Sequence, residues 1–224
     1  MLGLPDGITA LLFDLDGVLT DTAAVHAKAW KQTFDDEGYP FDIRADYDTY
    51  VDGKPREDGI RDFLASRDVH PSESEIKRIG DVKNALVNHL IDTEGVRSFE
   101  GSRRYLEAAT KAGFKRALVT SSNNAEKVLQ VTDMAKYMEQ RVDGGVRQKR
   151  GLKGKPAPDT FLEAARMLGV EPRHAAVFED ALAGVQAGRA GDFGYVVGVN
   201  RVNQAEALSE HGADIVVDDL GDLL

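Results

Sequence analysis

The 224-residue sequence has no cysteine and few aromatic side chains, and its 28 basic residues are outnumbered by 38 acidic ones. The absence of cysteine excludes a disulfide framework, a thiolate nucleophile and a zinc or iron–sulfur site held by cysteine. The net charge of −10 repels the phosphate backbone of a nucleic acid, which excludes nucleic acid as the main partner.

Membrane and targeting signals are also missing. The first fourteen residues contain neither a basic region nor a small-residue cleavage site. Their longest apolar run, Ala10 to Phe13, is far shorter than the roughly 20 residues of a membrane span. No basic helix suits an anionic membrane surface. We therefore expect no targeting segment, no membrane partner and a cytoplasmic location.

What the sequence does contain is typical of a folded soluble protein, with 42% hydrophobic and 29% charged residues. Short segments such as ALLF, RALVT, AAVF and YVVGV are apolar on successive residues. This pattern predicts strands buried on both faces, as in a parallel sheet covered by helices. The expected strands are Thr9–Asp14, Lys115–Thr120, Ala175–Glu179, Phe193–Val197 and Asp214–Val217.

Helical patterns alternate with these strands. The expected helices are Ser102–Ala112, Asn124–Asp133, Pro158–Leu168, Ala181–Arg189 and Gln204–Glu210. Glycines follow several of them, at Gly113, Gly169 and Gly212, as is usual at helix C-termini. The alternation of strand and helix predicts a doubly wound, Rossmann-like α/β domain.

One long stretch breaks this alternation. From about residue 22 to residue 96 the sequence has helical periodicity and no convincing strand, with helices expected at Ala23–Glu37, Arg56–Arg67 and Glu73–Thr93. Some 75 residues are far more than a normal crossover needs. We therefore expect a core domain formed by residues 1–21 and 97–224, with a helical cap, residues 22–96, inserted after the first strand.

The first expected strand ends in the acidic run Asp14-Leu15-Asp16-Gly17, followed by Thr20. Two aspartates one residue apart are common in this composition, but with the glycine and the threonine the run is expected by chance only about 0.01 times. Two carboxylates in one turn repel each other unless a cation or a proton intervenes. Mg²⁺ suits such oxygen ligands, and one carboxylate could attack phosphorus while the other moves a proton. The alternative is a turn that Asp16-Gly17 merely shapes.

Three further motifs were expected at the ends of later strands. Thr120-Ser121-Ser122-Asn123-Asn124 precedes a helix and could bind an anion or simply cap that helix. Lys155, before Pro156, is either a charge fixed near a phosphate or an ordinary surface lysine. Glu179-Asp180 ends an apolar strand, where two adjacent acids are better explained by a metal than by a helix dipole.

The order of the four motifs resembles that of the haloacid dehalogenase superfamily of phosphotransferases, and the resemblance covers nearly the whole chain. Within the superfamily the sequence is most similar to the β-phosphoglucomutase family and its related hydrolases. The additional matches are His26 and Trp30 after the first motif, and Gly53-Lys54-Pro55-Arg56 in the expected cap.

The resemblance implies a role for each of these residues. Asp14 would be the nucleophile that becomes an aspartyl phosphate, and Asp16 the general acid and base. Mg²⁺ would be held by Asp14, the Asp16 backbone carbonyl and Asp180, with Glu179 as a further ligand or a neighbour of the ligands. The remaining roles concern the substrate. Thr120, Ser121 and Lys155 would hold the transferring phosphoryl group, and Arg56, with Gly53 and Lys54, would bind the distal phosphate. Ser122, Asn124 and Trp30 would lie near the substrate, and His26 would position Asp16.

These roles imply Mg²⁺-dependent phosphoryl transfer on a sugar phosphate by a monomeric enzyme. The first hypothesis is a mutase that interconverts β-glucose 1-phosphate and glucose 6-phosphate, and the second is a sugar-phosphate phosphatase. The family pattern has lysine where this sequence has Asp52, and an acid there argues against the mutase. A phospho-accepting signalling domain is a distant alternative, because a receiver carries its phosphorylated aspartate on a middle strand and has no such insertion. A binding protein without activity is disfavoured by the intact motifs.

Overall fold

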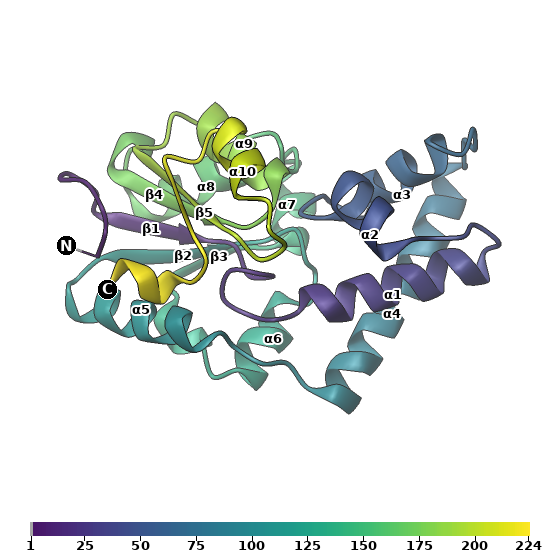
Figure 1. Cartoon of the computed structure of the whole chain (residues 1–224), viewed down its shortest axis with the longest axis horizontal. Coiled ribbons are helices and arrows are strands. Elements are labelled where there is room, and N and C mark those ends of the chain that lie inside the picture. The colour runs from purple at the N-terminus through teal and green to yellow at the C-terminus, as the bar shows by residue number, and fades with distance from the viewer. Residues whose placement is uncertain (1) are drawn as a thin grey trace.

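The core of the molecule is a six-stranded parallel sheet with the strand order β3-β2-β1-β4-β5-β6. The structure is a computed structural model that describes residues 2–224. Figure 1 shows the sheet with helices on both sides and the cap lobe beyond the carboxyl ends of the strands. The strands are β1 Ala10–Phe13, β2 Lys115–Val119, β3 Gln140–Val142, β4 Ala175–Glu179, β5 Tyr195–Val199 and β6 Ile215–Val217.

The central strands are buried on both faces because alternate side chains serve two hydrophobic cores. Leu11 and Phe13 pack into one core with α5 and α6, whereas Ala10 and Leu12 pack into the other with α8 and α9. Successive apolar residues are therefore required in β1, since neither face meets water. The core helices are α5 Glu100–Lys111, α6 Ala125–Val131, α7 Gly144–Arg150, α8 Asp159–Leu168, α9 Leu182–Ala190 and α10 Ala205–Glu210.

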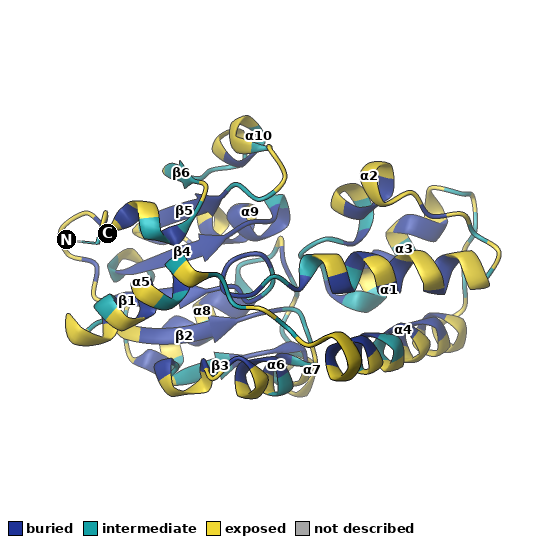
Figure 2. Ribbon diagram, turned by 60° about the horizontal axis from the view of Figure 1, so that its bottom comes forward, coloured by how far each residue is buried: buried dark blue, intermediate teal, exposed yellow. Residues whose placement is uncertain are grey.

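The cap lobe has a hydrophobic core of its own. Trp30, Phe34, Phe41 and Phe63 pack together there, and the rings of Phe34 and Phe63 are 4.1 Å apart. The lobe consists of α1 Ala23–Asp36, α2 Ile43–Asp46, the π-helical turn Tyr47–Val51, α3 Arg56–Ala65 and α4 Glu73–Glu94. Figure 2 shows buried residues on the inner sides of these helices and exposed residues on their outer sides. The division into domains at residues 21/22 and 96/97 stays a prediction.

The two connections between the lobes run side by side. The backbone N–H of Asp21 donates to the carbonyl of Arg97 at 2.9 Å, and Thr20 and Ser98 form an antiparallel bridge. The N–H of Phe99 donates to the carbonyl of Leu19 at 3.1 Å. The chain therefore leaves the core and returns to it at one paired junction.

The structure confirms all five expected strands and every expected helix to within a few residues. Over residues 2–224 it adds strand β3, helices α2 and α7, the π-helical turn and three short 3-10 helices. Strand β3 was not predicted because Gln140 and Arg141 interrupt any apolar run. Helix α2, with four residues, and α7, with the sequence GGVRQKR, are too short and too polar to give a periodic signal.

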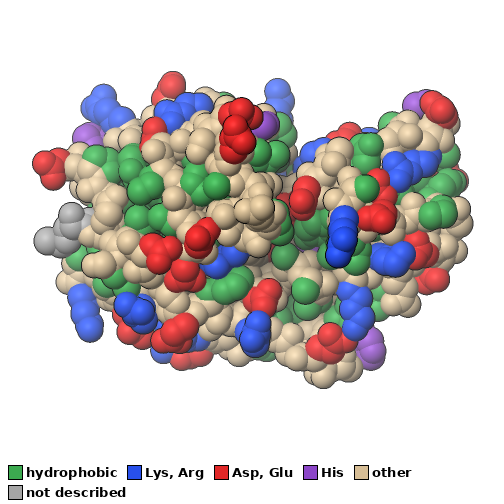
Figure 3. Space-filling view, in the orientation of Figure 1, with side chains coloured by type: hydrophobic (Ala, Val, Ile, Leu, Met, Phe, Trp, Pro, Cys, Tyr) green, Lys and Arg blue, Asp and Glu red, His purple; other side chains and the backbone are tan. Residues whose placement is uncertain are grey.

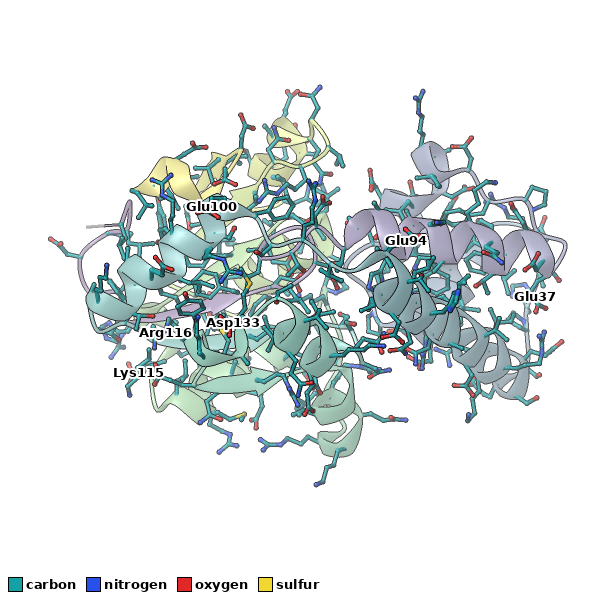
Figure 4. All side chains as sticks on the ribbon, turned by 90° about the horizontal axis from the view of Figure 1, so that it is seen from below. Glu37, Glu94, Glu100, Lys115, Arg116 and Asp133 are labelled. Carbon is teal, nitrogen blue, oxygen red and sulfur yellow. The ribbon has the colours of Figure 1, made fainter. Side chains whose placement is uncertain are left out.

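Most acidic residues lie at the surface, and many of them pair with a lysine or arginine. Figure 3 shows acidic and basic side chains intermingled over both lobes and a hollow where the lobes meet. Glu37 lies at the end of the cap lobe farthest from the core (Figure 4) and pairs with Arg78 at 2.6 Å. Within residues 2–224 no helix is long and apolar enough to cross a bilayer.

Candidate active site

The turn after β1 brings two carboxylates to the carboxyl edge of the sheet. The N–H of Asp14 donates to the carbonyl of Phe178 at 2.9 Å, which continues the ladder between β1 and β4, and the N–H of Gly17 donates to Thr20 at 2.8 Å to close the turn. Gly17 has a positive φ of 80°, and a Cβ there would overlap the carboxylate of Asp180. A glycine is therefore required both by the turn and by its acidic neighbour.

Lys155 is the buried cation of this edge. Its Nζ lies 2.5 Å from Oδ1 of Asp14 and 3.1 Å from the carbonyl of Val119, and it also contacts Glu179. Burial opposes the charged ammonium, but Asp14 and Glu179 outweigh it and raise the pKa of Lys155. The expectation that this lysine follows a strand was wrong: it lies in the loop between α7 and α8, and the preceding strand, β3, ends at Val142.

Glu179 and Asp180 end β4 beside Asp14. One oxygen atom from each of the three carboxylates lies within 4.8 Å of the others, and all three residues are buried. The N–H of Ala181 donates to Glu179 at 3.1 Å, and Gly184 of α9 leaves room for the Glu179 carboxylate. Among residues 2–224, Lys155 is the one cation in direct contact with this group, so the remaining repulsion has to be offset by a further cation or by protons. These oxygen ligands fit a hard divalent metal ion.

Asp16 is oriented by hydroxyls and faces a histidine. Thr22 donates a hydrogen bond to its carboxylate, and Nε2 of His26 lies 3.7 Å away. Burial, and then Lys83, lower the pKa of His26 well below its usual value, so the ring is neutral. Nζ of Lys83 lies 2.8 Å from Nδ1 of His26. When the ammonium donates to Nδ1, the ring proton resides on Nε2 and points toward Asp16.

The loop after β2 connects the core to the cap. The N–H of Ser122 donates to the Thr120 hydroxyl at 3.1 Å, which shapes the loop, and Ser121 donates to the carbonyl of Gly53 at 3.0 Å. The side-chain amide of Asn124 donates to Asn84 and accepts from Asn88, both at 3.0 Å. The lobes are therefore closed onto each other, with this loop and α4 in direct contact.

A cavity between the lobes collects most of the residues expected from the sequence. All of the site residues expected from the sequence line it except Lys155 and Glu179, which are buried beneath it. The lining residues among them are Asp14, Asp16, His26, Trp30, Gly53, Lys54, Arg56, Thr120, Ser121, Ser122, Asn124 and Asp180. Sequence reasoning missed Tyr47, Val51, Lys83, Asn84 and Asn123. The roles that the family resemblance implies for the expected site residues remain predictions.

The cavity has two ends of different charge. The core wall of the cavity, its acidic end, carries the carboxylates of Asp14, Asp16 and Asp180, and the cap wall, its basic end, carries Arg56 and Lys83. Nζ of Lys83 lies 4.6 Å from the centre of the Trp30 ring, and burial lowers the pKa of Lys83 to about 7 despite the opposing effect of Asp16. The basic end can hold an anionic group while the acidic end, with a metal ion, holds another.

Asp52, which belongs to the cap, interacts with acidic residues of the core. The charged groups that act on it most are Asp48, Glu179 and Asp16, and burial together with these neighbours raises its pKa to about 7. Lys54 pairs with Asp62 at 2.7 Å. Asp52 therefore interacts mainly with other acids, in the same cavity that Arg56 lines.

We expect the metal-free protein to lose stability as the pH rises from 6.5 to 8. Burial raises the pKa of Glu179 and of Asp52 to about 7, whereas such groups titrate near 4 in an unfolded chain. The native state therefore binds more protons than the unfolded state, and the free energy of unfolding falls as the pH rises. Lys83, with its pKa lowered to about 7, opposes this trend, because above pH 7 the unfolded state keeps a proton that the native state has lost, but the two acids outweigh this single group.

Thermal unfolding at pH 6.5 and pH 8 measures this effect, once with a chelator and once with Mg²⁺ in excess. The drop in Tm is expected to be larger with the chelator, because a bound cation offsets the carboxylate repulsion. An equal drop under both conditions would contradict the metal site.

The fold and the site define a family. The sequence matches the haloacid dehalogenase-like hydrolases over residues 8–192, and the chain belongs to this family. It is therefore an enzyme that transfers or hydrolyses phosphoryl groups, and the family uses a metal ion, for which the buried acidic group is suited.

The relatives are sugar-phosphate enzymes. A β-phosphoglucomutase of Mycobacterium bovis is 51% identical over 100% of this chain and 94% of its own length. A phosphorylated carbohydrates phosphatase of Thermotoga maritima is 29% identical over 93% of each chain. The crystal structure of a β-phosphoglucomutase from Clostridium difficile has a TM-score of 0.84 and 29% identity, covering 97% of this chain and 93% of that one.

Proposed function

We propose that the protein is a Mg²⁺-dependent β-phosphoglucomutase that converts β-glucose 1-phosphate to glucose 6-phosphate. The observation that carries the proposal is the two-ended cavity, with Asp14 and its acidic neighbours at one end and Arg56 at the other. Two separate phosphate sites are what a sugar bisphosphate requires, because one phosphate is carried on C1 and the other on C6. The 51% identity to a β-phosphoglucomutase over the whole chain supports the same activity.

In the first step, Asp14 attacks phosphorus while Asp16 protonates the leaving oxygen. The Asp14 carboxylate forms a bond to the phosphoryl group of the bisphosphate, the bond from phosphorus to the sugar oxygen breaks, and Asp16 gives its proton to that oxygen. In the reverse sense, Asp16 removes a proton from a sugar hydroxyl that takes the phosphoryl group back from Asp14. Lys155 offsets charge on the transferring oxygens.

Mg²⁺ would be held by Asp14, Asp180 and the backbone carbonyl of Asp16, with Glu179 beside them. When bound, it offsets the charge of the phosphoryl oxygens and of the carboxylates themselves. The closed lobes exclude water from the reacting atoms, and the contacts of Gly53 with Ser121 and of Asn84 with Asn124 serve that exclusion.

A direct assay separates this activity from hydrolysis. The protein is incubated with β-glucose 1-phosphate, a trace of β-glucose 1,6-bisphosphate and Mg²⁺, and glucose 6-phosphate and free phosphate are measured separately. Glucose 6-phosphate formation in excess of phosphate supports the mutase. Phosphate without glucose 6-phosphate would replace it with a phosphatase, as in the Thermotoga maritima relative.

We expect Asp52→Asn to lower the KM for β-glucose 1-phosphate about threefold to tenfold. The half-buried carboxylate interacts with Asp16 and Glu179 and repels the incoming phosphoryl group, and removal of one such charge is worth about 1 kcal/mol at the effective dielectric constant of a protein. Asp36→Asn makes the same change at an exposed position of cap helix α1 and serves as the control. An unchanged or raised KM for Asp52→Asn would show that the carboxylate does not repel the substrate.

A further inference from the structure

Glu57 of the cap lies between two arginines, one from each lobe. Its Oε1 is 3.5 Å from Nη2 of Arg56, and its Oε2 is 3.5 Å from Nη2 of Arg147 in core helix α7. The side chains are partly buried, with exposed fractions of 35% for Glu57, 19% for Arg56 and 21% for Arg147. The Nε atoms of both arginines are buried without a hydrogen-bond partner. One carboxylate is therefore shared by two incompletely satisfied guanidinium groups.

Arg56 has little room beside this carboxylate. Its guanidinium lies over Gly80 of α4, where an added Cβ would come within 3.0 Å of Nε. The same side chain lines the cavity between the lobes. Electrostatic attraction by Glu57 and steric contact with α4 therefore determine the orientation of the Arg56 guanidinium toward the cavity.

Arg147 belongs to the core, because its helix α7 is hydrogen-bonded to the loop after β2. The N–H of Gly144, at the start of α7, donates to the carbonyl of Ser122 at 3.1 Å, and Asp143 caps the helix by accepting from Val146 at 2.9 Å. Glu57 and Arg56 belong to the cap helix α3. The contact between Arg147 and Glu57 therefore exists only while the lobes are closed.

We propose that Arg147 is a positioning residue that acts on Arg56 through Glu57. When the lobes are open, Arg56 is nearer to Glu57 than Arg147 is, and its guanidinium pairs with the Glu57 carboxylate. On closure, Arg147 takes one of the two carboxylate oxygens, and the guanidinium of Arg56 is free to donate to an anion in the cavity. The second positive charge beside Glu57 also makes the cap end of the cavity more attractive to a phosphate group.

The proposal rests on the proposed function in one respect, because it takes the anion to be the phosphate of the sugar bisphosphate that is not transferred. Its chemistry is that of a phosphate dianion bound by a planar arginine fork. Arg147 itself does not touch this phosphate. It makes the affinity of Arg56 for phosphate depend on closure of the lobes.

The test measures binding of β-glucose 1,6-bisphosphate by calorimetry in the Asp14→Asn protein with Mg²⁺, since that protein cannot accept the phosphoryl group. Arg147→Ala is expected to raise the Kd about fivefold, and Arg147→Lys to restore part of the loss. When Arg56 is already alanine, Arg147→Ala is expected to have no further effect. Arg150→Ala is the control, because Arg150 lies on the same helix and pairs with Glu163 of the core.

The proposal would be overturned if Arg147→Ala left the Kd unchanged. It would also be overturned if Arg147→Ala raised the Kd by the same factor in the presence and in the absence of Arg56. Because binding is measured rather than turnover, the result does not depend on whether the wild-type enzyme forms glucose 6-phosphate. Failure of the proposed function would appear instead in the product assay.

A second measurement separates positioning from a plain closure contact. The chain has no cysteine, so cysteines introduced at the exposed positions Ser74 of the cap and Lys111 of the core can be spin-labelled without background. With ligand bound, Arg147→Ala is expected to show the closed distance of the parent protein. A distance that stays open would assign Arg147 to closure itself and overturn its role in orienting Arg56.

Discussion

Asp14→Asn is expected to reduce turnover of β-glucose 1-phosphate to background, the largest loss of any substitution in the chain. The amide cannot form the acyl phosphate through which the phosphoryl group passes, and it removes one oxygen from the group formed with Glu179 and Asp180. Steady-state rates over at least four decades, with Mg²⁺ in excess, measure the loss. Incubation with β-glucose 1,6-bisphosphate followed by mass spectrometry of the intact protein should show phosphorylation of the wild type and none of the variant.

The folding of this variant is open to a direct check. Asp14 is buried and its pKa is raised to about 6, chiefly by burial, so a neutral amide at this position is not costly. The variant is expected to melt at or above the temperature of the metal-free wild type. Turnover by a folded Asp14→Asn protein would remove Asp14 from the role of nucleophile.

Asp16→Asn is expected to slow turnover by about 10²–10⁴-fold, the contribution that general acid–base catalysis typically makes. The Asp16 carboxylate is held by Thr22 and faces Nε2 of His26, so an amide can occupy the same space but cannot transfer the proton. A substrate with a good leaving group, such as p-nitrophenyl phosphate, needs no proton at its departing oxygen. The loss in the release of p-nitrophenol is therefore expected to be much smaller than the loss with the sugar phosphate.

The sequence offers a matched control for this experiment. Asp46-Tyr47-Asp48 repeats the spacing of Asp14-Leu15-Asp16, yet Asp46 pairs with Arg67 within the cap and Asp48 is exposed. Asp48→Asn is expected to leave both rates within about twofold. An equal loss by Asp16→Asn with both substrates would show that Asp16 holds the site together and does not move the proton.

The core of the fold could be predicted because burial on both faces leaves a signal in the residues of each central strand themselves. Strand β1 has to be apolar on both faces, and its signal is therefore four consecutive buried residues, Ala10–Phe13. Strand β3 shows the limit: it gains its place from pairing with β2 at Ala117 to Val119, a property that residues 140–142 do not display. Pairing with a distant segment is decided by tertiary structure rather than by the residues themselves.

The same limit applies to the site. Asp14, Asp16, Glu179 and Asp180 were accessible from the sequence because parallel strands bring their carboxyl ends to one edge. Lys83 was not, because in the sequence it is one lysine on a long amphipathic helix, and its burial against His26 and Trp30 results from the packing of α1 on α4. The electrostatic contact of Asp52 with Asp16 and Glu179 was not accessible either, because it depends on the turn Tyr47–Val51, which has no signal of its own in the sequence.

The paired junction at Thr20–Asp21 and Arg97–Phe99 has a consequence for how such enzymes diversify. Because the chain exits and re-enters the core at adjacent points, the lobe between them can be lengthened, shortened or exchanged without altering the path of the sheet. Asp14, Asp16 and the acidic pair Glu179-Asp180 lie outside the exchanged segment, whereas Arg56, Lys83 and Asp52 lie within it. Mutations in one part of the gene can therefore change which phosphate ester is accepted while the other part preserves how it is cleaved.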